Sequence, residues 1–207
     1  MLDIRQDFHV HSNYNDHSAA NLTISNVVNH AQKIGLDSLA ITEHVNMESS
    51  WIEEYLNEIE LASQKADIKV IPGFEAKILR DGSINCPKEC GQYFLIASFH
   101  TLYKEKSVWV NALENAIRNP QVNVIGHLGP EPTFSLERNE IMELGRLIST
   151  NNKLVELNAK YHRPPKDWLI IFKECGVQFH LGSDAHSLDD IGRFETIMDL
   201  IALVNTS

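Results

Sequence analysis

The sequence predicts an α/β protein, a distorted seven-stranded (β/α)7 barrel of the TIM-like type, formed as one domain by residues 1–207. Seven short runs rich in Val, Ile, Leu and Phe alternate with segments whose apolar residues recur at helical spacing, a pattern typical of a parallel sheet. The runs are almost continuously apolar, as expected of strands that are covered on both faces. Six of the seven carry a histidine or a carboxylate near their ends, which indicates one shared functional end of the barrel.

The predicted strands are separated by segments long enough to form helices. We expect strands at residues 4–11, 38–44, 69–78, 93–100, 122–128, 154–160 and 177–184. We expect helices at residues 23–34, 50–66, 106–118, 136–149, 166–175 and 188–204. No linker, low-complexity tract or repeat interrupts this order, so the pattern predicts an undivided barrel.

Individual residues predict where several helices begin and end. Gly35 ends the first helix, and the spacing of Ser50 and Glu53 predicts a capping box at the start of the second. Ser135 is the expected cap of the fourth helix. The longest irregular insertion, residues 80–92, is equally compatible with a lid and with a plain long loop.

The composition is that of an ordinary soluble protein, with 43% hydrophobic and 22% charged residues. A formal net charge of −10 argues against neutralising a nucleic-acid backbone, whereas a small anionic substrate stays compatible if metal ions add local positive charge. No stretch predicts a membrane span or a signal peptide. The odd number of cysteines, three, predicts a reduced, cytoplasmic protein, and Cys86 and Cys90 are interpreted as loop thiols rather than a zinc site.

The residues near the strand ends have the chemistry of metal ligands. His9 and His11 stand two apart on one strand, so their side chains face the same way, and Asp184 and His186 repeat this spacing. The residues expected to meet at the barrel mouth are His9, His11, His17, His44, Glu75, His100, His127, Asp184 and His186. Imidazole and carboxylate together suit divalent zinc, manganese or iron, so this set predicts a metal cluster.

Taken together, these motifs resemble the PHP family, the polymerase and histidinol phosphatase superfamily. The matching segments are HVHSNYNDH at 9–17, ITEHVN at 41–46, GFEAKI at 73–78, SFH at 98–100, IGH at 125–127 and GSDAH at 182–186. They occur in the order of the family and cover the chain from Phe8 to Phe194. The resemblance implies a distorted seven-stranded barrel that holds three metal ions and hydrolyses phosphate esters.

The resemblance also implies which residues bind each ion. The expected groups are His9, His11, Glu75 and Asp184 for one ion, Glu75, His100 and His127 for a second, and His17, His44 and His186 for the third. All nine family positions are filled, which favours an active enzyme over a decayed domain. Glu43 stands where aspartate is common in the family, and we expect little consequence because it is not an implied ligand.

The expected reaction is hydrolysis of a small phosphomonoester, with histidinol phosphate or another phosphorylated metabolite as the substrate. Clustered divalent ions bring the pKa of a bound water near neutrality, and the resulting hydroxide can attack phosphorus in line. Asp184 and His186 are the candidate proton donors for the leaving group, and Glu75 is the catalytic residue expected to bridge two ions. Arg163 is the first candidate for binding the phosphate, since similar phosphatases tend to place an arginine after the sixth strand, and Arg193 is the second.

Three other functions stay open from the sequence alone. A phosphodiesterase or nuclease acting on nucleotides or DNA ends is opposed by the acidic charge and by the absence of a basic, aromatic-rich surface. A non-catalytic, metal-binding regulatory domain is opposed by the complete ligand set. Hydrolysis of protein phosphotyrosine, which some relatives perform, is neither favoured nor opposed, and the sequence makes no prediction of the oligomeric state.

Overall fold

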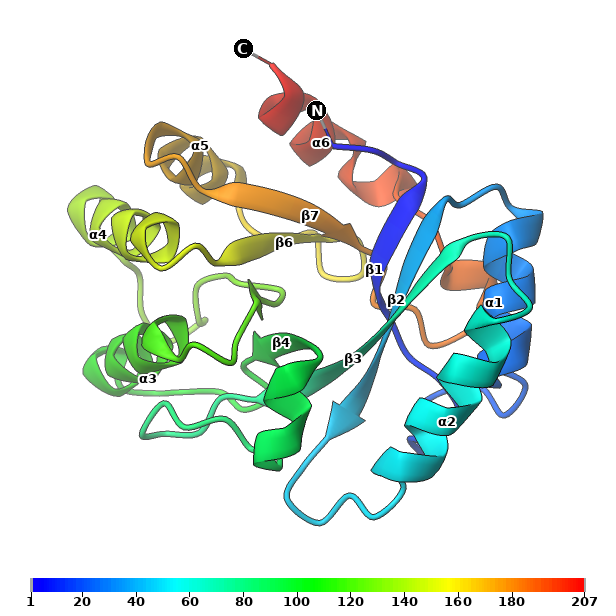
Figure 1. Ribbon diagram of the computed structural model, residues 1–207. Helices are drawn as coiled ribbons and strands as arrows, with labels where there is room; N and C mark the ends of the chain where they lie inside the picture. Colours follow the sequence, from blue (N-terminus) through cyan, green and yellow to red (C-terminus); the bar gives the residue numbers. More distant parts are fainter. Residues whose placement is uncertain (1, 207) are drawn as a thin grey trace.

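The computed structural model describes residues 2–206 and shows seven parallel strands in a nearly closed barrel, with helices around the outside (Figure 1). The elements are β1 (Gln6–Val10), α1 (Ile24–Lys33), β2 (Ser38–Val45), α2 (Ile52–Ser63), β3 (Lys69–Lys77), η1 (Lys88–Gln92), β4 (Phe94–Ser98), α3 (Lys106–Arg118), β5 (Val124–Ile125), α4 (Arg138–Thr150), β6 (Leu154–Asn158), α5 (Lys166–Glu174), β7 (Gln178–Gly182), η2 (Leu188–Asp190), η3 (Glu195–Ile197) and α6 (Met198–Asn205). Each strand pairs with its neighbours in sequence, from β1 to β7. The predicted fold class is confirmed.

The first and last strands meet at the carboxyl end of the barrel. A parallel bridge joins Val10 to Ala185, just beyond β7. The backbone N–H of His11 donates to the Ala185 carbonyl at 3.0 Å, and that of Asp184 donates to the His9 carbonyl at 2.8 Å. The barrel is therefore closed by the segments that carry His9 and His11 and Asp184 and His186, the two pairs of predicted ligands.

The main apolar core lies between the strands and the helices that surround them. Ile41 of β2 is fully buried, and so is Trp109, which α3 packs against the outside of the barrel. A smaller apolar cluster, which includes Leu157 and Leu200, joins β6 and β7 to α5 and α6. Burying a large apolar side chain contributes about 1.5–3 kcal/mol, so the packing of helices against strands supplies much of the stabilisation. None of the helices in residues 2–206 is both long and apolar enough to cross a bilayer.

Two predicted helix caps were wrong. Trp51 is the cap of α2, so the helix begins one residue later than the predicted box of Ser50 and Glu53 requires, and no side chain caps it. The cap of α4 is Glu137 rather than Ser135, because Glu137 takes part in a capping box of its own further along the chain. Both errors concern the register of a helix start and leave the helix itself in place.

The segment after β7 also differs from its prediction. A continuous helix was expected at residues 188–204, but two short 3₁₀ turns, η2 and η3, precede α6. Between them Gly192 has a φ of +70°, which a side chain would strain, and its N–H donates to the buried Asp7 carboxylate at 2.8 Å. The chain therefore leaves the helical path in order to pack against β1.

Residues 80–92 are anchored to their surroundings. The Asn115 side chain of α3 donates to the Asp81 carbonyl at 2.9 Å, and the Gln121 side chain donates to the Lys88 carbonyl at 3.0 Å. Gly82 lies so close to α3 that an added Cβ would meet the carbonyl oxygen of Ala112 at 2.7 Å. These contacts favour the interpretation as a plain long loop.

Candidate metal centre

The carboxylate of Glu75 lies at the centre of a group of histidines at the barrel mouth. Glu75 stands near the end of β3 and is 1% exposed. The ring nitrogens closest to it belong to His9, His11, His44, His100 and His127. Its Oε2 faces the first three, at 3.4, 3.6 and 2.9 Å, and its Oε1 faces the last two, at 3.1 Å each. A carboxylate with one oxygen toward each of two histidine groups could hold a metal ion on either side.

Strand geometry explains why these side chains meet. The parallel register places His44 of β2 directly opposite Glu75 of β3. His9 and His11 both reach the same site from the end of β1, as their spacing predicts. The barrel thus gathers ligand types from distant parts of the sequence at the carboxyl ends of its strands.

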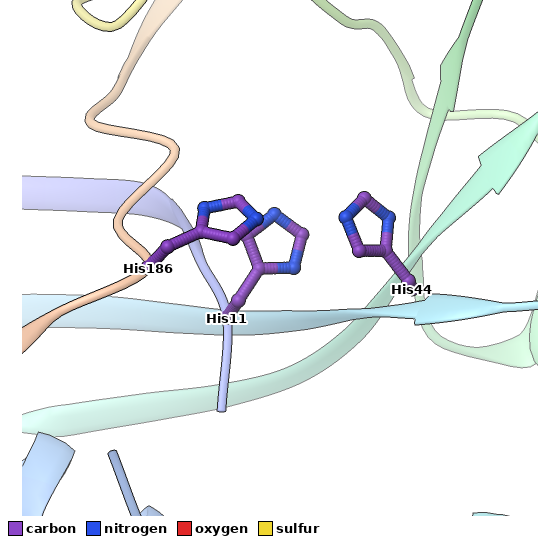
Figure 2. A group of neighbouring side chains, drawn as sticks. All are labelled: His11, His44 and His186. Carbon is purple, nitrogen blue, oxygen red and sulfur yellow. The ribbon is translucent and has the colours of Figure 1, made fainter. Parts of the chain in front are cut away.

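Three groups of side chains bring their ligand atoms within 4.8 Å of one another, which is close enough to share an ion. They are His9, His11 and Glu75; His44, Glu75 and His100; and His11, His44 and His186. Figure 2 shows the last group, in which imidazoles from the end of β1, from β2 and from the segment after β7 lie around one space. Glu75 belongs to two of the groups, in agreement with its central position.

The buried histidine nitrogens fit divalent metal ions. His9 and His11 are fully buried, and His9 Nε2 and both ring nitrogens of His11 have no hydrogen-bond partner among the described residues. A buried polar atom without a partner costs about 1–3 kcal/mol. Coordination to a metal ion would satisfy His9 Nε2 and one ring nitrogen of His11, so the donor set fits the ions that the sequence predicts.

The charges of the site also suit metal binding. Burial alone would raise the pKa of Glu75, but the positive charges of His9 and His100 hold it well below its usual range. Burial would likewise raise the pKa of Asp184, but the charge of His9 and the charge and hydrogen bond of His11 together lower it. Burial lowers the pKa of His186 to about 4. Ionised carboxylates and neutral imidazoles are the forms that bind metals. Burial would lower the pKa of His9, but Glu156, Glu75 and Asp184 raise it well above its usual value, so an entering ion would have to displace the proton of His9. The predicted role of Asp184 and His186 as proton donors needs their protonated forms.

Sequence reasoning missed Glu156, which holds two of the histidines in place. Glu156 lies on β6 and is fully buried. Its Oε1 is 2.6 Å from His9 Nδ1, and its Oε2 accepts the backbone N–H of His127 at 2.7 Å. A carboxylate on Nδ1 keeps the proton on that nitrogen and leaves Nε2 free for a metal. The signal in the sequence is a charged residue inside an otherwise apolar strand.

Glu43 plays a similar part behind His11, although we expected it to have little consequence. Its carboxylate accepts the Ser12 N–H at 2.9 Å, the Ser12 hydroxyl at 2.5 Å and the Asn15 amide at 2.5 Å. It lies 3.5 Å from His11 Nδ1. Burial would raise the pKa of Glu43, but His11 and these hydrogen bonds lower it to about 2. Glu43 therefore stays anionic and orients the ring of His11.

Two candidate ligands have an unusual backbone conformation. The φ angles of His127 and Asp184 are +25° and +55°, in a region that residues other than glycine rarely adopt. The Asp184 side chain accepts a hydrogen bond from Asn158 at 3.2 Å, while its other oxygen lies 3.3 Å from His11 Nε2. Strain of this kind, held by surrounding contacts, is often found at functional sites.

An open cavity of about 1320 Å³ lies above these residues. Its wall includes Tyr14, Trp51 and Arg163, the first candidate for binding the phosphate. The Arg163 side chain passes over Gly129, where an added Cβ would lie 2.7 Å from its Cδ and 2.8 Å from its Cζ. Glycine is needed here because any side chain would displace the guanidinium group.

Some predicted site residues lie elsewhere. His17 is 72% exposed at the rim of the cavity, 3.4 Å from an oxygen of Asp16, and belongs to none of the three groups. Its role as a ligand stays a prediction. Arg193 is 64% exposed and lines a separate hollow of about 380 Å³ beside α1, so the structure does not bring it to the cavity above Glu75. His162, which follows β6, lies 3.0 Å from Asp199 of α6.

Comparison with known proteins supports the fold and finds relatives of this chain. Residues 7–160 match the PHP domain. A "Probable phosphatase" of Caldicellulosiruptor bescii is 32% identical to this chain over 93% of the chain and 84% of its own length. A "Probable phosphatase" of Thermoanaerobacter sp. strain X514 is 29% identical to this chain, over 94% of the chain and 84% of its own length.

Two solved structures share the fold. A candidate histidinol phosphatase from Listeria monocytogenes superposes with a TM-score of 0.71 at 16% identity and covers 91% of this chain and 97% of its own. The N-isopropylammelide isopropylaminohydrolase of Burkholderia multivorans superposes with a TM-score of 0.55 at 10% identity and covers 86% of this chain and 61% of its own. At these identities the two structures show a common barrel and no common substrate.

Proposed function

Because the chain belongs to the PHP domain family, we propose that it is a metal-dependent phosphatase that hydrolyses a small phosphomonoester at the site around Glu75. The observation that carries the proposal is the position of Glu75, whose two oxygens face separate histidine groups. Divalent ions on either side of this carboxylate would supply an acidified water and positive charge for the phosphoryl oxygens. Phosphatase names among the relatives favour the same chemistry.

We assign the ligands as the sequence predicts, with differing support. The proposed groups are His9, His11, Glu75 and Asp184 for one ion, and Glu75, His100 and His127 for a second. Glu156 and Glu43 are positioning residues that orient the rings of the first group. The third predicted ion lacks one of its expected ligands at the site, because His17 is exposed at the rim. Zinc, manganese and iron all suit these donors.

The cavity supports a phosphorylated metabolite as the substrate. Arg163 would bind phosphoryl oxygens through its planar guanidinium group, which matches the geometry of phosphate. Tyr14 and Trp51 on the wall would contact the alcohol part of the substrate. Histidinol phosphate is one metabolite of this class. The phosphodiesterase and phosphotyrosine alternatives use the same centre and are separated from this proposal by substrate alone.

The test is phosphate release by protein purified without metals and then loaded with manganese, zinc or iron. The panel contains histidinol phosphate, mononucleotides, a phosphotyrosine peptide and p-nitrophenyl phosphate, with bis-p-nitrophenyl phosphate and single-stranded DNA as diesters. We expect metal-dependent turnover of monoesters, reduced at least about 100-fold by Glu75→Gln. The matched control is Glu53→Gln, at an exposed position of α2. Cleavage of the diesters alone would support the nuclease instead, and no turnover with any metal would refute the proposal.

A further inference from the structure

Asn158, the last residue of β6, makes hydrogen bonds in two directions beside the candidate metal centre. It is fully buried. Its side-chain nitrogen donates to Asp184 Oδ2 at 3.2 Å, and its side-chain oxygen accepts the backbone N–H of Tyr161 at 2.8 Å. An ionised carboxylate only accepts and a backbone N–H only donates, so the two partners together fix the orientation of the amide. One side chain thus connects the metal site to the segment that follows β6.

This segment, residues 159–163, is a short loop that closes on Asn158. The Asn158 backbone N–H donates to the Arg163 carbonyl at 2.9 Å, and the Arg163 N–H donates to the Asn158 carbonyl at 3.2 Å. The backbone pairs hold the two ends of the loop, and the side-chain bond to Tyr161 holds its middle. Because Tyr161 and Arg163 both line the cavity, the path of the loop determines where their side chains lie.

The other bond of the amide orients the Asp184 carboxylate. Asn158 is paired in register with Gly182 of β7, two residues before Asp184. Asp184 Oδ2 accepts from the amide, while Oδ1 lies 3.3 Å from His11 Nε2. A hydrogen bond to one oxygen of a carboxylate ligand fixes the direction in which the other oxygen meets an ion.

Lys160 makes a second contact between the loop and Asp184, of a different kind. Its Nζ lies 3.1 Å from Asp184 Oδ1, and its side chain is 37% exposed. A long, partly solvated side chain can keep such a contact while the backbone of the loop moves, because its four-carbon stem is flexible. The short, buried amide of Asn158 has no such freedom, so it is the contact that fixes the carboxylate and the loop together.

We propose that Asn158 is a positioning residue that holds the Asp184 carboxylate and the loop of residues 159–163 in one arrangement, so that binding of an ion at Asp184 and of a phosphate group at Arg163 both depend on its amide. The inference deepens the proposed function and rests on it for Arg163 as the residue that binds phosphate. Loss of the amide frees Asp184 Oδ2 and the Tyr161 N–H at the same time. One substitution should therefore weaken two kinds of binding.

The test variant is Asn158→Leu, which keeps the branched shape and removes both hydrogen bonds. Metal affinity is measured by competition with a chromophoric chelator for manganese or zinc, and we expect one of the bound ions to be held about 10–100-fold less tightly. Inorganic phosphate is then titrated calorimetrically into each protein, at free metal high enough that elemental mass spectrometry finds equal metal content. We expect phosphate to bind at least about 10-fold more weakly, as expected for loss of a hydrogen bond to a charged group.

A double variant separates positioning of Arg163 from a general loosening of the protein. If Asn158 acts on phosphate through Arg163, Asn158→Leu should weaken phosphate binding in wild type and change it by less than about twofold in Arg163→Ala. A general loosening would instead weaken phosphate binding by the same factor in both backgrounds. This comparison uses binding alone and needs no turnover.

The matched control is Asn123→Leu. The Asn123 side chain also accepts a backbone N–H, that of Leu95 at 2.8 Å, but it precedes β5 at the opposite end of the barrel. We expect its metal and phosphate affinities to equal those of wild type. Asn158→Ala, which is smaller than leucine and demands no space, is the second test variant, and thermal unfolding followed by circular dichroism checks that each protein is folded.

Three results would overturn the inference. They are metal and phosphate affinities within about twofold of wild type in a folded Asn158 variant, an equal loss of phosphate affinity in the wild-type and Arg163→Ala backgrounds, and the same losses in Asn123→Leu. If wild type binds metal and phosphate as expected but releases phosphate from no phosphomonoester, the phosphatase function is refuted and the role of Asn158 stands.

Discussion

The substitution Glu156→Gln tests whether a buried carboxylate sets the proton position of a metal ligand. Glu156 is fully buried and accepts from two donors, with Oε1 2.6 Å from His9 Nδ1 and Oε2 2.7 Å from the His127 backbone nitrogen. A glutamine has nearly the same shape but offers one acceptor oxygen and one amide group that only donates. One of the two contacts must therefore be lost.

Both possible orientations of the glutamine harm the site. If the amide nitrogen faces His9, it donates to Nδ1, the ring proton moves to Nε2, and the nitrogen that points toward Glu75 can no longer bind a metal. If the amide nitrogen faces the His127 N–H, two donors meet and a buried N–H loses its partner, at a cost of about 1–3 kcal/mol. Loss of such a contact to a ligand weakens metal binding by about 10–100-fold, or about 1.4–2.7 kcal/mol.

The assay is a competition titration, in which a chromophoric chelator and the protein compete for the tighter of the bound ions. Thermal unfolding of the metal-free proteins, followed by circular dichroism, checks that the variant is folded. The control is again Glu53→Gln, which changes the charge by the same amount at an exposed position. Metal affinity within about twofold of wild type in a folded Glu156→Gln protein would show that the carboxylate does not control His9.

Three further changes probe the positions around the ligands. His11 and hydrogen bonds lower the folded-state pKa of Glu43 from its ordinary 4.5 to about 2, so its contribution of about 3 kcal/mol is present above pH 4.5 and is lost as the pH falls toward 2. Urea unfolding of the metal-free protein at a series of pH values should show this loss of unfolding free energy in wild type and not in Glu43→Gln. An equal dependence of the unfolding free energy on pH in the two proteins would contradict it. Tyr55→Phe should destabilise the protein by about 1–3 kcal/mol, because the buried Tyr55 hydroxyl lies 2.8 and 2.9 Å from backbone carbonyls of β2 and β3. An unchanged midpoint of urea unfolding in this variant would refute the prediction. Gly129→Ala should displace the Arg163 guanidinium and raise the KM for a phosphomonoester by about 10–100-fold, with the metal content unchanged. A normal KM in both this variant and Arg163→Ala would show that the arginine does not bind the substrate.

The order of elements could be predicted because parallel strands buried on both faces leave an unmistakable pattern. All seven strands and the first five helices lie where the periodicity places them, although β5 retains only two residues of its predicted run and α6 begins only at Met198. The helix starts were harder to predict. The sequence Ser50 to Glu53 satisfies the spacing of a capping box, yet a cap also depends on where tertiary packing begins the helix, and the spacing contains no information on that.

The central part of the site could likewise be predicted, because strand ends of a barrel converge at one mouth. His9, His44 and His100 lie around Glu75 as expected. The loop residue His17 does not, since position along a loop does not determine where a side chain points. Glu156 escaped notice because it lies within a strand, where a charged residue is visible in the sequence but its partner, 147 positions away, is not.

The joining of β1 to β7 has a consequence for how the protein is made. The hydrogen bond from the Asp184 N–H to the His9 carbonyl connects the start of the chain to its end. At synthesis rates of 5–20 residues per second, the ribosome needs roughly 10–35 seconds to add the residues from His9 to Asp184. During that time the early histidines exist in an unclosed sheet, where they are exposed to any metal in the surroundings. Selection of the correct ions therefore belongs to the completed chain, and a nascent chain that stalls before Asp184 would present ligands without the barrel that arranges them.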